Sequence, residues 1–369
     1  MSSAMHIEEP LKALNAICPY YTMFPLDFPL RVLQGRARKG DWVVDPFCGR
    51  GTTNFAARLL GLSSFGVDSS PVAVALTQAK LADARVSDVV RTAKGILDSM
   101  PSRVAVPNGD FWERAYEPAV LRQICWLRKD LLRDCSSDSR LLLRAILLGA
   151  LHGPRTKLAA SHLSNQCPRT FAPKPDYAVR FWRKRRMKPP AVNVVEVVRT
   201  RARRYLSQRP AYTPAHVVLG DSRAAKVFES RQFRWAITSP PYYGMRTYIP
   251  DQWLRNWFLG GPAHVTYKPP ARELDHASAD AFADDLRKVW MGIAASAAID
   301  ARLVIRFGGI ADRDVDPVTL LKSSLSDSGW RLTTAVSAGD ANAGRRQATQ
   351  FVHGGPAPKE EYDFYAVLA

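Results

Sequence analysis

Short apolar runs that end in polar or turn-forming residues recur along the chain. They lie at 41–44, 63–67, 217–220, 235–238, 301–307 and 361–368. Runs of this length are typical of buried β-strands. Apolar residues at helical spacing follow the first two runs, at 54–61 and from Pro71 onward, where a proline can begin a helix. This alternation of strands and helices predicts an α/β fold.

The segment 85–214 interrupts the alternation. Apolar spacing predicts helices within it at 89–100, 118–132, 139–152 and 192–206, and the Ser, Asn and Pro content of 161–175 predicts a loop. A plain doubly wound sheet has short connections. We therefore interpret the segment as a mostly helical inserted domain rather than as a sign that the third strand is misplaced. The expected regions are 1–84, 85–214 and 215–369.

The most informative motif is Ser239-Pro240-Pro241-Tyr242, directly after the apolar run 235–238. Neither proline has an N–H to donate to a strand, so the chain must leave the sheet here with the carbonyls of Ser239 and Pro240 free. Two free acceptors followed by an aromatic ring suit the exocyclic amino group of a base on which Tyr242 would stack. An ordinary strand ending in a Pro-Pro turn is the alternative.

A glycine-rich turn at 45–53 joins the first predicted strand to its helix. Gly49 and Gly51 would let a ligand approach the backbone closely, although an ordinary tight turn would also contain them. The turn lacks the third glycine of the dinucleotide pattern and the lysine of a P-loop, so phosphate is not the ligand expected there. A nucleoside with a charged amino-acid tail fits better, with Asp45 near its positive end.

Two further acids stand at the ends of predicted strands. Asp68 is placed to accept hydrogen bonds from ribose hydroxyls. Asp221 could receive an adenine amino group. For each of them, a helix cap or a solvated loop acid is the alternative.

Together these motifs resemble the amino-directed DNA methyltransferases that use S-adenosylmethionine. The matching pieces are DPFCGRGTT (45–53), GVDSSP (66–71), LGDS (219–222) and TSPPY (238–242). The segment 23–33 resembles the family's N-terminal helix, which closes over the methionine moiety. The resemblance implies a Rossmann-like class I methyltransferase sheet with helices on both faces. It also implies S-adenosylmethionine as cofactor, bound by Phe24, Pro25, Asp45, Pro46, Phe47, Gly49, Gly51, Thr52, Thr53, Asp68, Ser69, Asp221 and Ser222.

The resemblance further implies a catalytic turn formed by Ser239, Pro240, Pro241 and Tyr242, acting on a base extruded from the duplex. In the family, Ser at the first position is usual for N4 of cytosine and Asp for N6 of adenine. We therefore expect N4 of cytosine, with N6 of adenine as the alternative. Two alternative functions belong to other classes: an RNA base methyltransferase and a non-catalytic DNA-binding module.

The formal net charge is +18, and 11 Lys or Arg against one acid lie between 179 and 209. A positive surface attracts nucleic acid without reading its sequence. Double-stranded DNA is therefore the expected partner and 85–214 the expected recognition region, with a solvated helix face as the alternative. The candidate contacts to nucleic acid are Arg169, Arg183, Lys184, Arg185, Arg186, Arg246, Tyr248, Arg345 and Arg346.

Composition indicates the cellular compartment and excludes some partners. No apolar run reaches the length of a signal peptide or a membrane span. Five cysteines without C-x-x-C spacing indicate a reducing compartment and no zinc site. We expect no metal, no membrane partner, and a cytoplasmic, nucleoid-associated location in a prokaryote or a phage. Any restriction endonuclease is expected on a separate polypeptide, since no nuclease motif stands out, and the sequence leaves the oligomeric state open.

Overall fold

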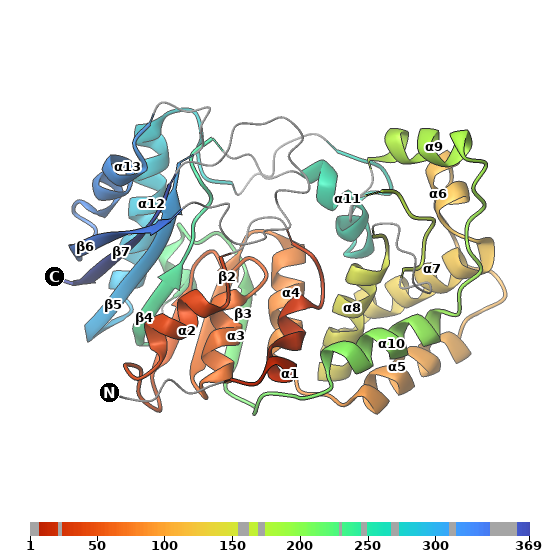
Figure 1. Cartoon of the computed structure of the whole chain (residues 1–369), viewed down its shortest axis with the longest axis horizontal. Helices are drawn as coiled ribbons and strands as arrows, with labels where there is room; N and C mark the ends of the chain where they lie inside the picture. The colour runs from red at the N-terminus through yellow and green to blue at the C-terminus, as the bar shows by residue number, and fades with distance from the viewer. Residues whose placement is uncertain are drawn as a thin grey trace.

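The computed structural model describes residues 7–20, 24–153, 162–168, 174–228, 231–244, 249–266, 273–309, 315–339 and 360–369. The strands within these ranges are β1 (Trp42–Asp45), β2 (Ser63–Asp68), β3 (Ala215–Leu219), β4 (Phe233–Thr238), β5 (Ala297–Gly308), β6 (Trp330–Gly339) and β7 (Glu361–Leu368). They form one sheet in the order β3-β2-β1-β4-β5-β7-β6 (Figure 1). The first five strands are parallel, whereas β7 runs antiparallel to both β5 and β6.

Helices connect and cover these strands. In the first part of the chain they are α1 (Glu9–Lys12), η1 (Ala13–Ala16), α2 (Asp27–Leu33), α3 (Thr52–Leu59) and α4 (Pro71–Leu81). Between α4 and β3 lie α5 (Val86–Asp98), α6 (Asp110–Ala115), α7 (Pro118–Arg133), α8 (Asp138–Ala150), α9 (Pro175–Lys184) and α10 (Val194–Tyr205). The later helices are η2 (Ala225–Val227), α11 (Ile249–Phe258), α12 (Ala279–Ala294) and α13 (Pro317–Leu325). None of the helices in the described ranges is long and apolar enough to cross a membrane.

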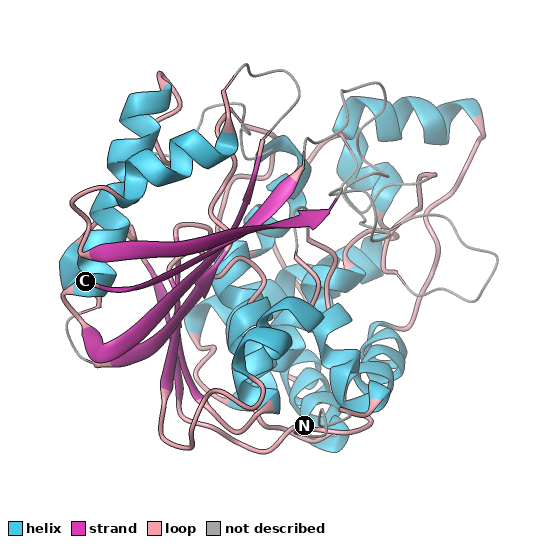
Figure 2. Ribbon diagram, turned by 60° about the vertical axis from the view of Figure 1, so that its left-hand side comes forward, coloured by secondary structure: helices cyan, strands magenta, loops and turns pink. Residues whose placement is uncertain are grey.

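Alternation of side chains along the strands gives the sheet two buried faces. On one face Val43 and Ile237 pack against α2 and α3. On the other, Val44 and Ala236 pack against α12 and α13. Figure 2 shows helices on both sides of the twisted sheet. The predicted α/β fold, a Rossmann-like sheet with helices on both faces, is confirmed.

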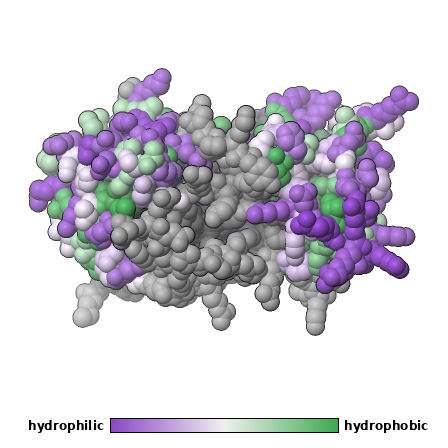
Figure 3. All heavy atoms as spheres, turned by 90° about the horizontal axis from the view of Figure 1, so that it is seen from above, coloured by the Kyte–Doolittle hydropathy of each residue, from purple (hydrophilic) through white to green (hydrophobic). Residues whose placement is uncertain are grey.

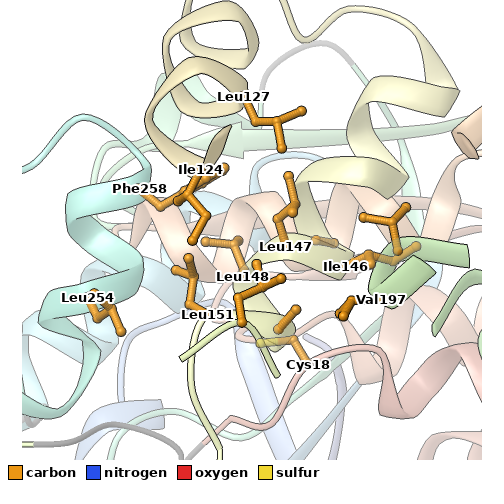
Figure 4. Close-up of a cluster of buried hydrophobic side chains, with 14 of the residues drawn as sticks. Cys18, Ile124, Leu127, Ile146, Leu147, Leu148, Leu151, Val197, Leu254 and Phe258 are labelled. Atoms are coloured by element: carbon orange, nitrogen blue, oxygen red, sulfur yellow. The ribbon is translucent and has the colours of Figure 1, made fainter. Parts of the chain in front are cut away.

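The helices between α4 and β3 pack beside the sheet around α8 (Figure 1). Leu147 and Leu148 of α8 are fully buried, and the same cluster takes in Ala79 of α4 and Phe258 of α11. Figure 4 shows this junction, with Cys18 beside the leucines of α8. The helical segment therefore shares one hydrophobic core with elements on both sides of it in the sequence.

The structure also contains elements that the apolar pattern did not indicate. β6 lies at the edge of the sheet and is mostly exposed, so it carries no apolar run. α9 begins at Pro175, at the end of the stretch predicted as loop. The helices α6, α12 and α13 were not predicted either.

Candidate active site

The glycine-rich turn and the Ser-Pro-Pro-Tyr turn lie side by side because β1 and β4 are neighbours in the sheet. Val44 pairs with Ala236 in the register, and both turns leave the sheet at the carboxyl ends of these strands. The strand order reverses between β1 and β4, which is where parallel sheets of this kind bind ligands. The topology therefore brings together two motifs that are almost 200 residues apart.

Asp45 joins the two turns. Its Oδ1 accepts a 2.6 Å hydrogen bond from the hydroxyl of Thr238, the last residue of β4, and another from the N–H of Phe47 at 3.1 Å. Its Oδ2 is buried and has no hydrogen-bond partner. Burial raises the pKa of Asp45 to about 6, against the opposing effect of these hydrogen bonds. The site thus holds a buried acceptor that still lacks a donor.

We expect the free energy of unfolding to fall as the pH rises from about 4, where an unfolded Asp ionises, to about 6, because the folded protein keeps the Asp45 proton over that range. Asp45→Asn should reduce this slope by up to one proton, or about 1.4 kcal/mol per pH unit. Urea unfolding at several pH values measures it. An unchanged slope in the variant would show that Asp45 titrates normally.

Side-chain contacts determine the shape of the glycine turn. Gly51 has φ of +75°, and a Cβ there would lie 2.7 Å from the side chain of Thr77 in α4. The hydroxyl of Thr77 donates to the carbonyl of Gly49 at 3.1 Å. At Gly49, by contrast, the nearest atoms to such a Cβ are 3.9 Å away. Gly51 is therefore required for packing, whereas a Cβ at Gly49 would make only ordinary van der Waals contacts with Tyr20 and the carbonyl of Phe47.

Asp68 holds the same turn from the end of β2. Its Oδ2 accepts from the N–H of Gly49 and its Oδ1 from the N–H of Ser70, both at 2.8 Å. Burial raises the pKa of Asp68 to about 6, although these N–H groups favour the ionised form. Each carboxylate oxygen accepts more than one hydrogen bond, so Asp68 keeps capacity for a ribose hydroxyl. Ser69, beside it, is half-buried.

Asp221 and Ser222 follow β3, and both form hydrogen bonds with nearby residues of the protein. Both Asp221 oxygens accept from the guanidinium of Arg223, with a shortest distance of 2.6 Å, and Arg223 also contacts Asp285 at 2.7 Å. The hydroxyl of Ser222 donates to the carbonyl of Pro46 in the glycine turn. An adenine amino group would have to share Asp221 with Arg223, so its adenine contact stays a prediction.

The Ser-Pro-Pro-Tyr turn is partly open to solvent. Ser239 and Pro241 are half-buried, and Pro240 is buried. The ring of Tyr242 is 9% exposed and packs edge-on against Phe307 at 5.4 Å, and its hydroxyl donates to Glu361. Stacking of Tyr242 on a base therefore stays a prediction, and it would use the part of the ring that Phe307 does not cover.

Phe24 and Pro25 precede α2, next to the sheet. Phe24 packs edge-on against Phe28 at 5.4 Å. The guanidinium of Arg306 lies 4.0 Å from the ring centre of Phe28. Arg306 also forms an ion pair with Asp363 of β7 through two hydrogen bonds. A buried ion pair on the sheet thus anchors the helix predicted to close over the cofactor.

Comparison with known proteins adds to this geometry. Residues 7–79, which contain α2, the glycine turn and Asp68, match the model of a family described as DNA methylase. The type II methyltransferase M.BsoBI of Geobacillus stearothermophilus is 32% identical over 68 residues, which are 18% of this chain and 13% of that protein. Over residues 7–79, this chain is therefore similar to the DNA methylase family, and it spans only a small part of the length of that relative.

Solved structures resemble this chain only distantly. The rRNA methyltransferase aviRa from Streptomyces viridochromogenes is 12% identical, with coverage of 100% of this chain and 95% of that one and a TM-score of 0.35. TrmN from Thermus thermophilus is 10% identical, with coverage of 93% and 48% and a TM-score of 0.35. Scores this low carry no information about substrate.

Several residues of the candidate site gave no signal in the sequence. Thr238 and Thr77 are ordinary-looking residues whose contacts to Asp45 and Gly49 depend on the fold. Glu361 reaches Tyr242 from the far end of the chain. The Nδ1 of His276 accepts from the N–H of Gly244 at 3.0 Å and so holds the segment after the catalytic turn. Only a strand partner or a spatial neighbour identifies these residues.

The predicted DNA contacts divide into two groups. Arg183, Lys184, Arg185 and Arg186 are exposed at the end of α9. Figure 3 shows hydrophilic side chains gathered at the end of the molecule that carries α9. The other candidates, Arg169, Arg246, Tyr248, Arg345 and Arg346, lie outside the described residues.

Cys48 is buried beside Thr77, with 3.6 Å between the sulfur and the hydroxyl oxygen. Burial, reinforced by the charges of Asp68 and Asp45, raises the pKa of its thiol well above the usual value. A thiol kept protonated is not a nucleophile, so we interpret Cys48 as a structural residue of the glycine turn. No group of three His, Cys, Asp or Glu among the described residues could hold a metal ion.

Proposed function

We propose that this chain transfers a methyl group from S-adenosylmethionine to the exocyclic amino group of an extruded DNA base, with N4 of cytosine preferred and N6 of adenine as the alternative. The observation that carries the proposal is the hydrogen bond between Thr238 and Asp45. It ties the strand that ends in Ser-Pro-Pro-Tyr to the acid of the glycine turn, so a base at one turn and a methyl donor at the other would meet.

The residues of the glycine turn fit S-adenosylmethionine. The amino-acid tail of this cofactor carries an ammonium group, and the buried Oδ2 of Asp45 is an acceptor without a donor. Because Gly49 has no side chain, a ligand could approach its backbone closely, and Asp68 has acceptor capacity for ribose. We therefore assign the methionine tail to Asp45 and the ribose to Asp68. When bound, the cofactor supplies an electrophilic methyl group on a sulfonium centre.

In this mechanism the protein's contribution is to orient the acceptor. An amino group conjugated to a base ring is a poor nucleophile because its lone pair is delocalised. The Ser239 side chain and the Pro240 carbonyl would each accept a hydrogen bond from it, which favours a pyramidal nitrogen whose lone pair faces away from the turn. Such positioning of two reactants accounts for several kcal/mol of barrier reduction. The amino group loses its proton late in the methyl transfer, so no strong base is needed.

Incubation of the purified chain with S-adenosylmethionine and duplex DNA tests the proposal. Mass spectrometry of the digested DNA would identify N4-methylcytosine or N6-methyladenine. A tRNA acceptor in parallel separates DNA from RNA substrates. Methylation of tRNA alone, or cofactor binding without any transfer, would rule out the proposed activity.

We expect the exposed lysine and arginine side chains at the end of α9 to bind phosphates of the DNA backbone. Lys184→Gln combined with Arg186→Gln should lower the slope of log affinity against log salt by about 2, and weaken binding equally for all sequences. Fluorescence anisotropy with duplex DNA at several salt concentrations measures this. The charge-matched control is Lys322→Gln with Arg331→Gln, on exposed positions of α13 and β6. Equal slopes in the two double variants would exclude α9 from the interface.

A further inference from the structure

A groove of about 450 Å³ lies on the outer side of α7, between the segment that follows α5 and the end of α11. The opposite side of α7 is buried in the core. Figure 4 shows Ile124 and Leu127 of that side pointing toward the leucines of α8. The groove therefore occupies the face of α7 that the core leaves open.

Large apolar side chains line this groove and remain in contact with solvent. Leu132 of α7 is 45% exposed and Val106 is 38% exposed, while Val104 is half-buried. Trp126 is also half-buried, and its ring is oriented by a 2.7 Å hydrogen bond from the indole N–H to the carbonyl of Ile96. Apolar side chains that gather in one exposed hollow are typical of a surface that another molecule covers.

The charged side chains of the groove are all positive. Arg103 and Lys129 are exposed and Arg128 is half-buried, and the described residues that line the groove include no Asp or Glu. None of these three cations forms an ion pair with a carboxylate of the described residues. Arg128 is held in place by a 2.7 Å hydrogen bond from its Nε to the carbonyl of Trp257. Three cations beside apolar side chains suit an occupant that is both acidic and apolar.

One wall of the groove is the segment 103–107, and its backbone is free to bind a peptide. The segment is neither helix nor strand. Its N–H and C=O groups form no hydrogen bond with the backbone of any residue that the structure describes. Free backbone groups can pair with the main chain of a bound peptide, as the edge of a sheet does. The wall therefore offers donors and acceptors that recognise a polypeptide.

We propose that this groove docks a segment of a second polypeptide that is rich in acidic and apolar side chains. The carboxylates of the segment would face the three cations, and its apolar side chains would cover Val106 and Leu132. Its main chain would pair with the wall formed by 103–107. The groove takes no part in the proposed methyl transfer, so this partner goes beyond the proposed function.

Nucleic acid and a second copy of this chain suit the groove less well. A base that stacks needs an open aromatic face. Trp257 is only 4% exposed, and the ammonium of Lys129 lies 5.3 Å from the ring centre of Trp126. A second copy would bring together surfaces of the same sign, since the net charge of the chain is +18. These observations favour an acidic polypeptide.

Fluorescence anisotropy of the full chain with a labelled peptide of the repeat Glu-Glu-Val-Val tests the groove. This repeat places both kinds of side chain on each face of an extended peptide. We expect saturable binding, and at least tenfold weaker binding in the double variant Arg103→Glu with Lys129→Glu. The matched control, Lys322→Glu with Arg331→Glu, reverses two exposed cations of α13 and β6 and should bind as the wild type does. Equal affinities of the two double variants, or no saturable binding by the wild type, would overturn the proposal.

Three further measurements separate the proposed occupant from the alternatives. A peptide of the repeat Glu-Glu-Ser-Ser should bind at least tenfold more weakly, and equal binding would mean that charge alone attracts the peptide. Displacement of the acidic peptide by a short single-stranded oligonucleotide would assign the groove to nucleic acid. Sedimentation that shows self-association in the wild type but not in Arg103→Glu with Lys129→Glu would assign it to a second copy. Each of these three results would overturn the proposal. Loss of methyl transfer with peptide binding intact would refute the proposed function alone.

Discussion

Ser239→Ala is expected to slow methyl transfer to DNA by about 10²–10³-fold, the usual cost of removing one oriented hydrogen-bonding group from a reacting centre. Ser239 directly follows β4 and is half-buried, so its side chain can reach a base that enters from solvent. Without it the Pro240 carbonyl alone would orient the amino group. Binding of S-adenosylmethionine should be unchanged, because the glycine turn and Asp68 are untouched.

Single-turnover kinetics with saturating cofactor measure the transfer step, and calorimetry measures cofactor binding. Ser323→Ala, at an exposed serine of α13, is the matched control and should behave as the wild type does. A loss of cofactor binding in Ser239→Ala would mean that the turn belongs to the cofactor site. A normal transfer rate would mean that Ser239 does not touch the reacting amino group.

The second large effect is expected from Asp68→Ala, which should weaken binding of S-adenosylmethionine by about 100-fold or more. The carboxylate accepts from the N–H groups of Gly49 and Ser70, and hydrogen bonds to a charged group contribute about 1.5–3 kcal/mol each. Their loss would leave the glycine turn without its support, and the proposed ribose contact would be lost as well.

Calorimetric titration of the variant with S-adenosylmethionine checks this expectation. Asp98→Ala removes an exposed acid at the end of α5 and should retain wild-type affinity. The affinity of Asp68→Asn for S-adenosylmethionine should lie between those of Asp68→Ala and Asp98→Ala, since its amide oxygen can still accept a hydrogen bond from one of the N–H groups. Wild-type affinity in Asp68→Ala would show that the acid only shapes the turn and that the cofactor binds elsewhere.

Much of the sheet could be predicted because parallel strands buried on both faces require continuous apolar runs. β7 was predicted with the bounds that the structure has, and β1, β2 and β4 within two residues at either end. The edge strand β6 could not be found, since its exposed side chains leave no such run. The stretch around α9 was recognised as basic by its charge. Its helix was not predicted, because the buried face of that helix packs against α6.

The sequence by itself determined the two turns of the candidate site. Glycine and proline restrict the backbone locally, so DPFCGRGTT and TSPPY indicate their shapes without any knowledge of the fold. Only the tertiary structure decided which side chains serve those turns. Thr238 reaches Asp45 because β4 lies beside β1, and Glu361 at the start of β7 reaches Tyr242 because β7 lies beside β5. Such contacts arise from packing between distant segments, which no local pattern of residues encodes.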